Sequence, residues 1–124
     1  MAKDNQQIAT DDMQQTIYKE LGYKSYPFPF TTPAYLEAYG TLVGLKPPTA
    51  KTARVLELGA TYGGNIISQA VHNPEAKFVG IELSQDQVEK GNKIISDAKL
   101  DNVSLLQGDI LNFDESLGNF DYII

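Results

Sequence analysis

The sequence predicts an α/β fold in which a parallel sheet carries helices on both faces. Short apolar runs alternate with longer segments of helical periodicity, and Gly or Asn-Pro breaks separate them. This alternation is typical of parallel strands joined by right-handed helical crossovers. A glycine-rich loop directly follows the first apolar run, where such sheets bind ligands. Because only about four strands fit into 124 residues, we expect an incomplete sheet.

Four strands are expected in order along the second half of the chain. Their predicted ranges are 54–58, 77–82, 103–107 and 120–124, each rich in residues that favour β-structure. The last range would form an exposed apolar edge, and such edges pair readily with another chain. Self-association through 120–124 is therefore expected.

Two helices are expected between these strands. The first spans 63–72 and stops before an Asn-Pro pair. The second begins at Ser84, which has the spacing of a capping box with Gln87, and runs to about Lys99. Its inward-facing residues, chosen by helical spacing, are Val88, Ile94, Ile95 and Ala98.

The chain is expected to divide into three parts. Residues 1–15 form a polar tail, for which we expect disorder, above all over residues 1–9. Residues 16–50 form a cap segment that combines helical patterns with prolines and aromatic residues. Residues 51–124 hold the first half of the sheet domain.

The cap segment is punctuated by prolines. The stretch Y-K-S-Y-P-F-P-F-T-T-P places three prolines among aromatic residues, which excludes a helix there. A helix is expected before it, between Thr10 and Gly22. Another is expected after it, with Thr32 as N-cap and Pro33 at the first position, ending at Gly44. One side of this second helix carries Tyr35, Leu36, Tyr39, Leu42 and Val43.

Composition excludes several classes of function. No run approaches the roughly 18 apolar residues of a membrane span, and the N-terminus has no secretory or transit signal, so a cytoplasmic protein is expected. The absence of Cys and the single His72 argue against disulfides, thiolate nucleophiles, metal sites and a Ser-His-Asp triad. A net charge of −6, from 16 acidic and 10 basic residues, disfavours nucleic acid as a partner.

The loop V-L-E-L-G-A-T-Y-G-G-N, residues 55–65, is compatible with several ligands. Gly59, Thr61 and Gly64 fall on the three glycine positions of the dinucleotide fingerprint, which is therefore only partly met. A phosphate-cradling P-loop needs a Lys where this chain has Asn65. Two rivals stay open: an NAD(P)-dependent oxidoreductase, and a non-catalytic module of the same fold that binds a nucleoside or a protein.

The charge of Glu57 separates these alternatives. Unit charges about 4 Å apart interact by roughly 4 kcal/mol at an effective dielectric of about 20, so Glu57 would repel a diphosphate and attract a cation. S-adenosyl-L-methionine is a nucleoside cofactor with an ammonium and a sulfonium group in place of phosphates. The next strand ends agree, because Glu82 can accept both ribose hydroxyls and Asp109 the adenine amino group. Leu83 and Ile110 can pack on the adenine ring.

These residues resemble a known family. V-L-E-L-G-x-x-x-G-G-N, V-G-I-E-L-S, L-L-Q-G-D-I and F-D-Y-I-I resemble, in order and spacing, the Rossmann-like class I S-adenosylmethionine-dependent methyltransferases over about residues 53–124. The cap segment, with Y-K-E-L-G-Y and G-L-K-P-P, is similar to the N-terminal segment of bacterial methyltransferases that carry a methyltransferase regulatory domain. The family sheet has more strands than fit here. The resemblance therefore implies an N-terminal fragment of a longer enzyme, inactive by itself.

The resemblance also implies which residues contact the cofactor, and that tyrosines of the cap segment, Tyr18, Tyr23 and Tyr26 among them, close over its methyl end. Thr61 stands where the family usually has glycine, and Thr32 where it often has His. No catalytic residue is identified, and the unidentified acceptor is expected to be a protein or a small molecule rather than nucleic acid. The predicted cofactor-binding set is Glu57, Gly59, Ala60, Thr61, Gly63, Asn65, Glu82, Leu83, Asp109 and Ile110.

Overall fold

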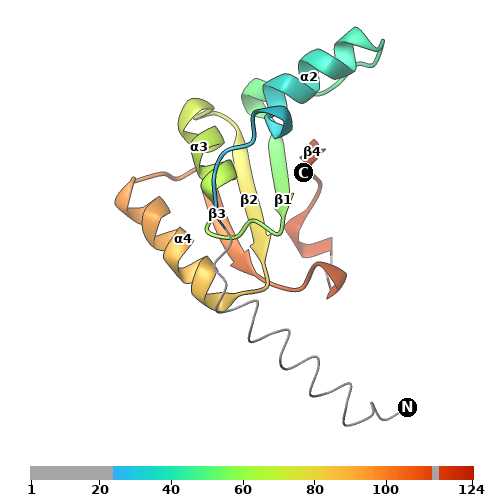
Figure 1. Ribbon diagram of the computed structural model, residues 1–124. Helices are drawn as coiled ribbons and strands as arrows, with labels where there is room; N and C mark the ends of the chain where they lie inside the picture. Colours follow the sequence, from blue (N-terminus) through green and yellow to red (C-terminus); the bar gives the residue numbers. More distant parts are fainter. Residues whose placement is uncertain (1–23, 113–114) are drawn as a thin grey trace, which may run out of the picture.

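A computed structural model describes residues 24–112 and 115–124 and confirms the expected α/β fold (Figure 1). All four strands pair in parallel, in the order β3-β2-β1-β4. The first three have the predicted bounds. The predicted tail and the helix between Thr10 and Gly22 lie outside the described residues. The strands are β1 (Arg54–Leu58), β2 (Lys77–Glu82), β3 (Val103–Gln107) and β4 (Tyr122–Ile123).

Strand β4 is shorter than the predicted 120–124. Backbone bonds to β1 nevertheless continue on both sides of it, because Asp121 N donates to Arg54 O (2.8 Å) and Leu58 N donates to Ile124 O (2.9 Å). The guanidinium of Arg54 donates to the carbonyl oxygens of Asn119 (2.9 Å) and Leu117 (3.0 Å), and it lies 4.9 Å from the centre of the Phe120 ring. These contacts fix the segment before β4 beside the start of β1.

Two helices cover one face of the sheet. Helix α3 (Gly64–His72) connects β1 to β2, and helix α4 (Gln85–Asp97) connects β2 to β3. Both crossovers run in the same direction along the sheet, which places both helices on the same side (Figure 1). The prediction placed helices on both faces, whereas these two cover only one. The core between helices and sheet includes Val55, Ile66, Phe78, Val88, Val103 and Leu105.

The strand order reverses at β1. The chain moves outward from β1 to β2 and β3, then returns to place β4 on the other side of β1. In open α/β sheets the crevice at such a reversal, beyond the carboxyl ends of the strands, is where ligands bind. The loop after β1 therefore lies where a ligand site is expected.

The N-terminus of α4 differs from the prediction. Ser84 is the N-cap, but its side chain makes no capping bond, and both amide atoms of Gln87 are buried without a partner in the described part of the chain. The backbone N–H of Ser84 donates instead to Glu82 Oε1 (2.9 Å). The expected capping box is therefore wrong, because a buried carboxylate two residues earlier occupies the donor that Gln87 would have reached.

The buried stripe of α4 is also narrower than expected. Val88 and Ile95 are buried as predicted, whereas Ile94 and Ala98 are exposed. Gly91 lies at the centre of the buried stripe, where an added Cβ would come within 2.2 Å of Leu105. Helix α4 thus faces the sheet through Gly91, Val88 and Ile95. Ile94 and Ala98 lie outside this face.

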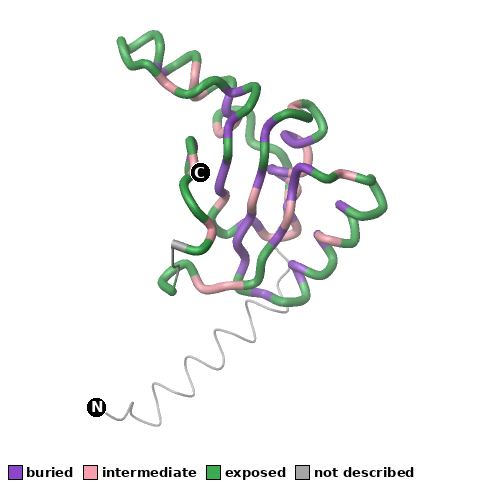
Figure 2. The backbone as a smooth tube through the Cα atoms, turned by 180° about the vertical axis from the view of Figure 1, so that it is seen from behind, coloured by how far each residue is buried: buried purple, intermediate pink, exposed green. Residues whose placement is uncertain are grey.

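Before the sheet, residues 24–28 are extended and lead into the 3-10 turn η1 (Pro29–Thr31); we refer to residues 24–31 as the strap. Helix α2 (Pro33–Leu42) follows and starts as predicted, with the side chain of Thr32 accepting from Tyr35 N (3.3 Å). Figure 2 shows α2 mostly exposed, in contrast to the buried strands. On its predicted apolar side, Leu36 is partly buried against the core, whereas the other four members are exposed: Tyr35, Tyr39, Leu42 and Val43.

Candidate cofactor site at the carboxyl edge of the sheet

The loop between β1 and α3 turns through three left-handed residues. Gly59, Thr61 and Gly63 have φ of 74°, 49° and 79°. The N–H groups of Gly59 and Ala60 both donate to Ile81 O at 2.9 Å, which ties the loop to β2. Thr61 is the unusual member, because a β-branched residue with positive φ is strained by on the order of 1–3 kcal/mol.

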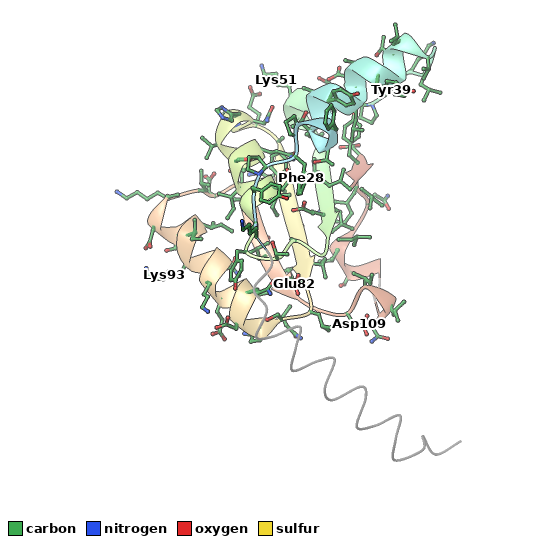
Figure 3. All side chains as sticks on the ribbon, in the orientation of Figure 1. Phe28, Tyr39, Lys51, Glu82, Lys93 and Asp109 are labelled. Atoms are coloured by element: carbon green, nitrogen blue, oxygen red, sulfur yellow. The ribbon has the colours of Figure 1, made fainter. Side chains whose placement is uncertain are left out.

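The buried carboxylate of Glu82 binds the backbone of the loop. It ends β2 and is only 1% exposed. Its Oε2 accepts from Thr61 N (3.0 Å) and its Oε1 from Ser84 N (2.9 Å), so one carboxylate joins the loop to the start of α4. Figure 3 shows Glu82 and Asp109 at the same edge of the sheet, after β2 and β3.

Glu57 is the acidic group of the loop entrance. Its Oε1 accepts from Asn65 Nδ2 (2.7 Å), while its Oε2 is buried without a hydrogen-bond partner in the described residues. Burial raises the pKa of Glu57, and the hydrogen bond from Asn65, with a smaller effect of the Ile66 backbone, counteracts part of that shift. A half-satisfied carboxylate of this kind favours a cationic partner, because an unmade hydrogen bond to a buried charged group is costly.

Two hollows meet at this loop. The first, here called the strap hollow, has a volume of about 390 Å³ and lies between the strap and the loop. The second, here called the edge hollow, has a volume of about 270 Å³ and lies over the ends of the strands. Gly59 lines both, and an added Cβ there would meet nothing within 4 Å. An elongated ligand can therefore pass from one hollow to the other over Gly59.

Most of the predicted site residues line these hollows. Those of the strap hollow are Glu57, Gly59, Ala60 and Thr61. Those of the edge hollow are Gly59, Glu82, Leu83, Asp109 and Ile110. Residues that follow three different strands, β1, β2 and β3, thus lie together along one edge of the sheet.

Two predicted residues lie behind the hollows. Gly63 is buried, and an added Cβ would lie 3.0 Å from Ile67 and 3.2 Å from Leu105. Asn65 is 4% exposed and binds Glu57 through its amide group. Their described contacts are with other protein groups, Gly63 in the turn into α3 and Asn65 in the orientation of Glu57.

The strap supplies residues that sequence reasoning missed. Lys24, Ser25, Tyr26 and Phe28 all line the strap hollow. Tyr26 was among the tyrosines expected near the site, whereas Tyr18 and Tyr23 lie outside the described residues. The other three carry no local signal, since their role depends on where the strap crosses the loop.

Comparison with known proteins matches this geometry to a family. The family described as "Methyltransferase domain" matches residues 49–124. The chain belongs to this methyltransferase family. Its class I members use S-adenosylmethionine as cofactor. The match covers the sheet, α3, α4, the loop and the edge hollow, and it starts after the strap.

Solved and curated relatives extend the match into the strap. The structure of PKMT2 from Rickettsia typhi in complex with AdoHcy is 46% identical, with a TM-score of 0.78, over 82% of this chain and 19% of that chain. From Rickettsia prowazekii, "Uncharacterized protein RP028" is 44% identical and "Uncharacterized protein RP789" 41% identical, each over 107 residues. The present chain spans 43% and 19% of the length of these two relatives.

The described ranges were also compared with the requirements of a metal site and of a membrane-spanning helix. Residues 24–112 and 115–124 contain no group of three or more His, Asp or Glu side chains able to hold a metal ion. Within the same ranges, every helix is too short or too polar to cross a membrane.

Proposed function

We propose that this chain binds S-adenosylmethionine across the strap hollow and the edge hollow and forms the cofactor-binding part of a methyltransferase. The observation that carries the proposal concerns Glu57, a residue that lines the strap hollow and whose Oε2 is buried without a hydrogen-bond partner among the described residues. The ammonium group of the cofactor would supply that partner. A diphosphate would place negative charge against it.

The remaining residues fit the rest of the cofactor. Glu82 lines the edge hollow, where Thr61 N and Ser84 N hold its carboxylate in place, and this position suits contact with the ribose hydroxyls. Leu83 and Ile110 are half or more exposed around the edge hollow and offer apolar contact to the adenine ring. Asp109 accepts from Leu111 N through Oδ1, which orients its carboxylate at the rim.

The bound cofactor supplies an activated methyl group, which passes to a nucleophile of the acceptor as the carbon–sulfur bond breaks. The chain's own described residues contribute by position: they anchor the amino acid, ribose and base so that the methyl group has a defined direction. We assign no proton-transfer role to any of them. The acidic net charge of −6 favours a protein or small-molecule acceptor over nucleic acid.

The test compares ligands on the purified chain by calorimetry and ligand-observed NMR. We expect S-adenosylhomocysteine to bind and NADH not to bind, because only NADH brings phosphates to Glu57. Glu57→Ala should abolish the signal, and Glu89→Gln, an exposed change on α4, should leave it intact. Binding of NADH but not of S-adenosylhomocysteine would reject the proposal in favour of an oxidoreductase.

A further inference from the structure

Thr61 keeps a side chain where glycine would be free of strain. Among the described residues, Thr61 and Lys99 are the non-glycine residues with positive φ, at 49° and 56°. Lys99 follows the end of α4, a common place for such a residue. Thr61 lies inside the cofactor loop, and a strained conformation there persists only where the surroundings hold it.

The hydroxyl group of Thr61 binds the strap. Thr61 Oγ1 donates to Ser25 Oγ at 2.8 Å, and the same Ser25 oxygen accepts from Gly64 N at 2.7 Å. The strap also presses on α3 at this point, because a Cβ on Gly64 would lie 2.6 Å from Ser25 Oγ and 2.7 Å from its carbonyl carbon. Further along, Phe28 N donates to Asn65 Oδ1 at 2.7 Å.

These polar contacts matter because the strap buries little apolar surface. Tyr26 and Phe28 remain 51% and 46% exposed although they line the strap hollow. Their rings, 4.9 Å apart, pack mainly on each other. Hydrophobic burial therefore holds the strap weakly, and its position depends on the hydrogen bonds at Ser25, Phe28 and Thr31.

We propose that the Thr61–Ser25 hydroxyl pair is a latch that holds the strap over the strap hollow and slows the release of a bound nucleoside. Thr61 is thus a positioning residue that acts through Ser25. The identity of the ligand rests on the proposed function, whereas the seating of the strap does not. A glycine at 61 would relax the loop and at the same time free the strap.

The test uses Thr61→Gly, Thr61→Ser and Ser25→Ala in the full chain. We measure three quantities: thermal stability, hydrogen exchange of the strap amides, and the dissociation rate of S-adenosylhomocysteine. In Thr61→Gly we expect strap exchange and ligand dissociation to rise about fivefold, the loss of one net hydrogen bond. In Ser25→Ala we expect a larger rise, because this change also removes the acceptor of Gly64 N. Thr61→Ser keeps the hydroxyl and should stay within about twofold of wild type.

Stability separates a latch from a merely structural role. Thr61→Gly should melt at the same temperature as wild type or higher, since strain is removed while the strap loosens. Lys99→Gly is the matched control, because it removes the side chain of the other non-glycine residue with positive φ. Its stability should be equal to that of wild type or higher. Strap exchange and ligand dissociation should not change.

The latch is overturned if strap exchange in Thr61→Gly equals that of wild type, or if Thr61→Val, which lacks the hydroxyl, keeps slow exchange and slow dissociation. If wild type binds no S-adenosylhomocysteine, the proposed function fails, while the exchange comparison still decides the latch.

Discussion

Asn65 Nδ2 lies 2.7 Å from Glu57 Oε1, and the same amide group also binds the strap. Its Nδ2 donates to Thr31 Oγ1 (2.9 Å), and its Oδ1 accepts from Phe28 N (2.7 Å). One buried side chain therefore joins the candidate ligand group, Glu57, to the segment that covers it. The orientation of Glu57 and the seating of the strap depend on the same residue.

Asn65→Ala should lower the free energy of unfolding by about 2–4 kcal/mol. The change leaves Glu57 Oε1 and Phe28 N without their partner, and each buried unsatisfied polar group costs about 1–3 kcal/mol. Urea denaturation measures the difference. Asn119→Ala serves as the control, because Asn119 is exposed and its described bond to Arg54 uses the backbone carbonyl. Equal stability of the two variants would contradict the assigned role.

Glu57→Gln should weaken the binding of S-adenosylhomocysteine about tenfold or more without destabilising the fold. The amide removes a charge that burial disfavours, yet it also removes the charged acceptor for the ammonium group, worth about 1.5–3 kcal/mol. Calorimetric titration and thermal melting measure the two effects. A variant that loses stability but keeps its affinity would show that Glu57 is structural.

The pH dependence has a defined sign. Burial raises the pKa of Glu57 above its ordinary value of 4.5, so the folded chain binds this proton more tightly than the unfolded chain. The stability that this provides is full below pH 4.5 and is lost as pH rises through the raised pKa. Affinity for a cationic ligand should rise over the same interval. Titrations from below pH 4.5 to neutrality should show this rise in wild type and not in Glu57→Gln.

Gly91→Ala should destabilise the fold by about 1–3 kcal/mol, although alanine favours helix by about 1 kcal/mol. The added Cβ would lie 2.2 Å from Leu105 and 2.7 Å from Tyr62 O, which belongs to the loop between β1 and α3. Gly40→Ala in α2 is the matched control, because its Cβ would sit at an ordinary 3.4 Å from Pro47. Thermal melting should therefore show opposite signs for the two changes.

Asp109→Asn should leave the fold unchanged and weaken binding of S-adenosylhomocysteine about tenfold. The amide oxygen can still accept from Leu111 N, as Oδ1 does now. The other oxygen becomes an NH₂ group, which repels the amino group of adenine. Asp101→Asn, an exposed change outside both hollows, is the control. Unchanged affinity would place the adenine elsewhere.

Ile123→Lys should reduce self-association. Ile123 is 63% exposed on β4, which pairs only with β1 among the described strands. A charge on an open edge strand discourages pairing with another chain. Size-exclusion chromatography with light scattering should show a lower mean mass for the variant at high concentration. A wild-type chain that stays monomeric would reject association through this edge.

Local sequence determined the elements that the structure confirms. The bounds of β1, β2 and β3 follow from short apolar runs, and Thr32-Pro33 marks the start of α2 correctly. The family assignment follows from the order of the strand-end motifs. Such signals survive folding because strand and cap preferences depend on neighbours only a few residues away.

Tertiary structure alone decided which groups meet at the site. Glu82 binds Thr61 N across 21 positions and Ser25 binds Gly64 N across 39. The carboxylate of Glu82 also accepts from Ser84 N, and that bond replaces the capping box expected there. The contact of Ser25 revealed the strap. No local pattern encodes either bond, because each depends on the register of parallel strands and on the path of a crossover. The sequence determined that a ligand loop exists, and packing over long separations decided what covers it.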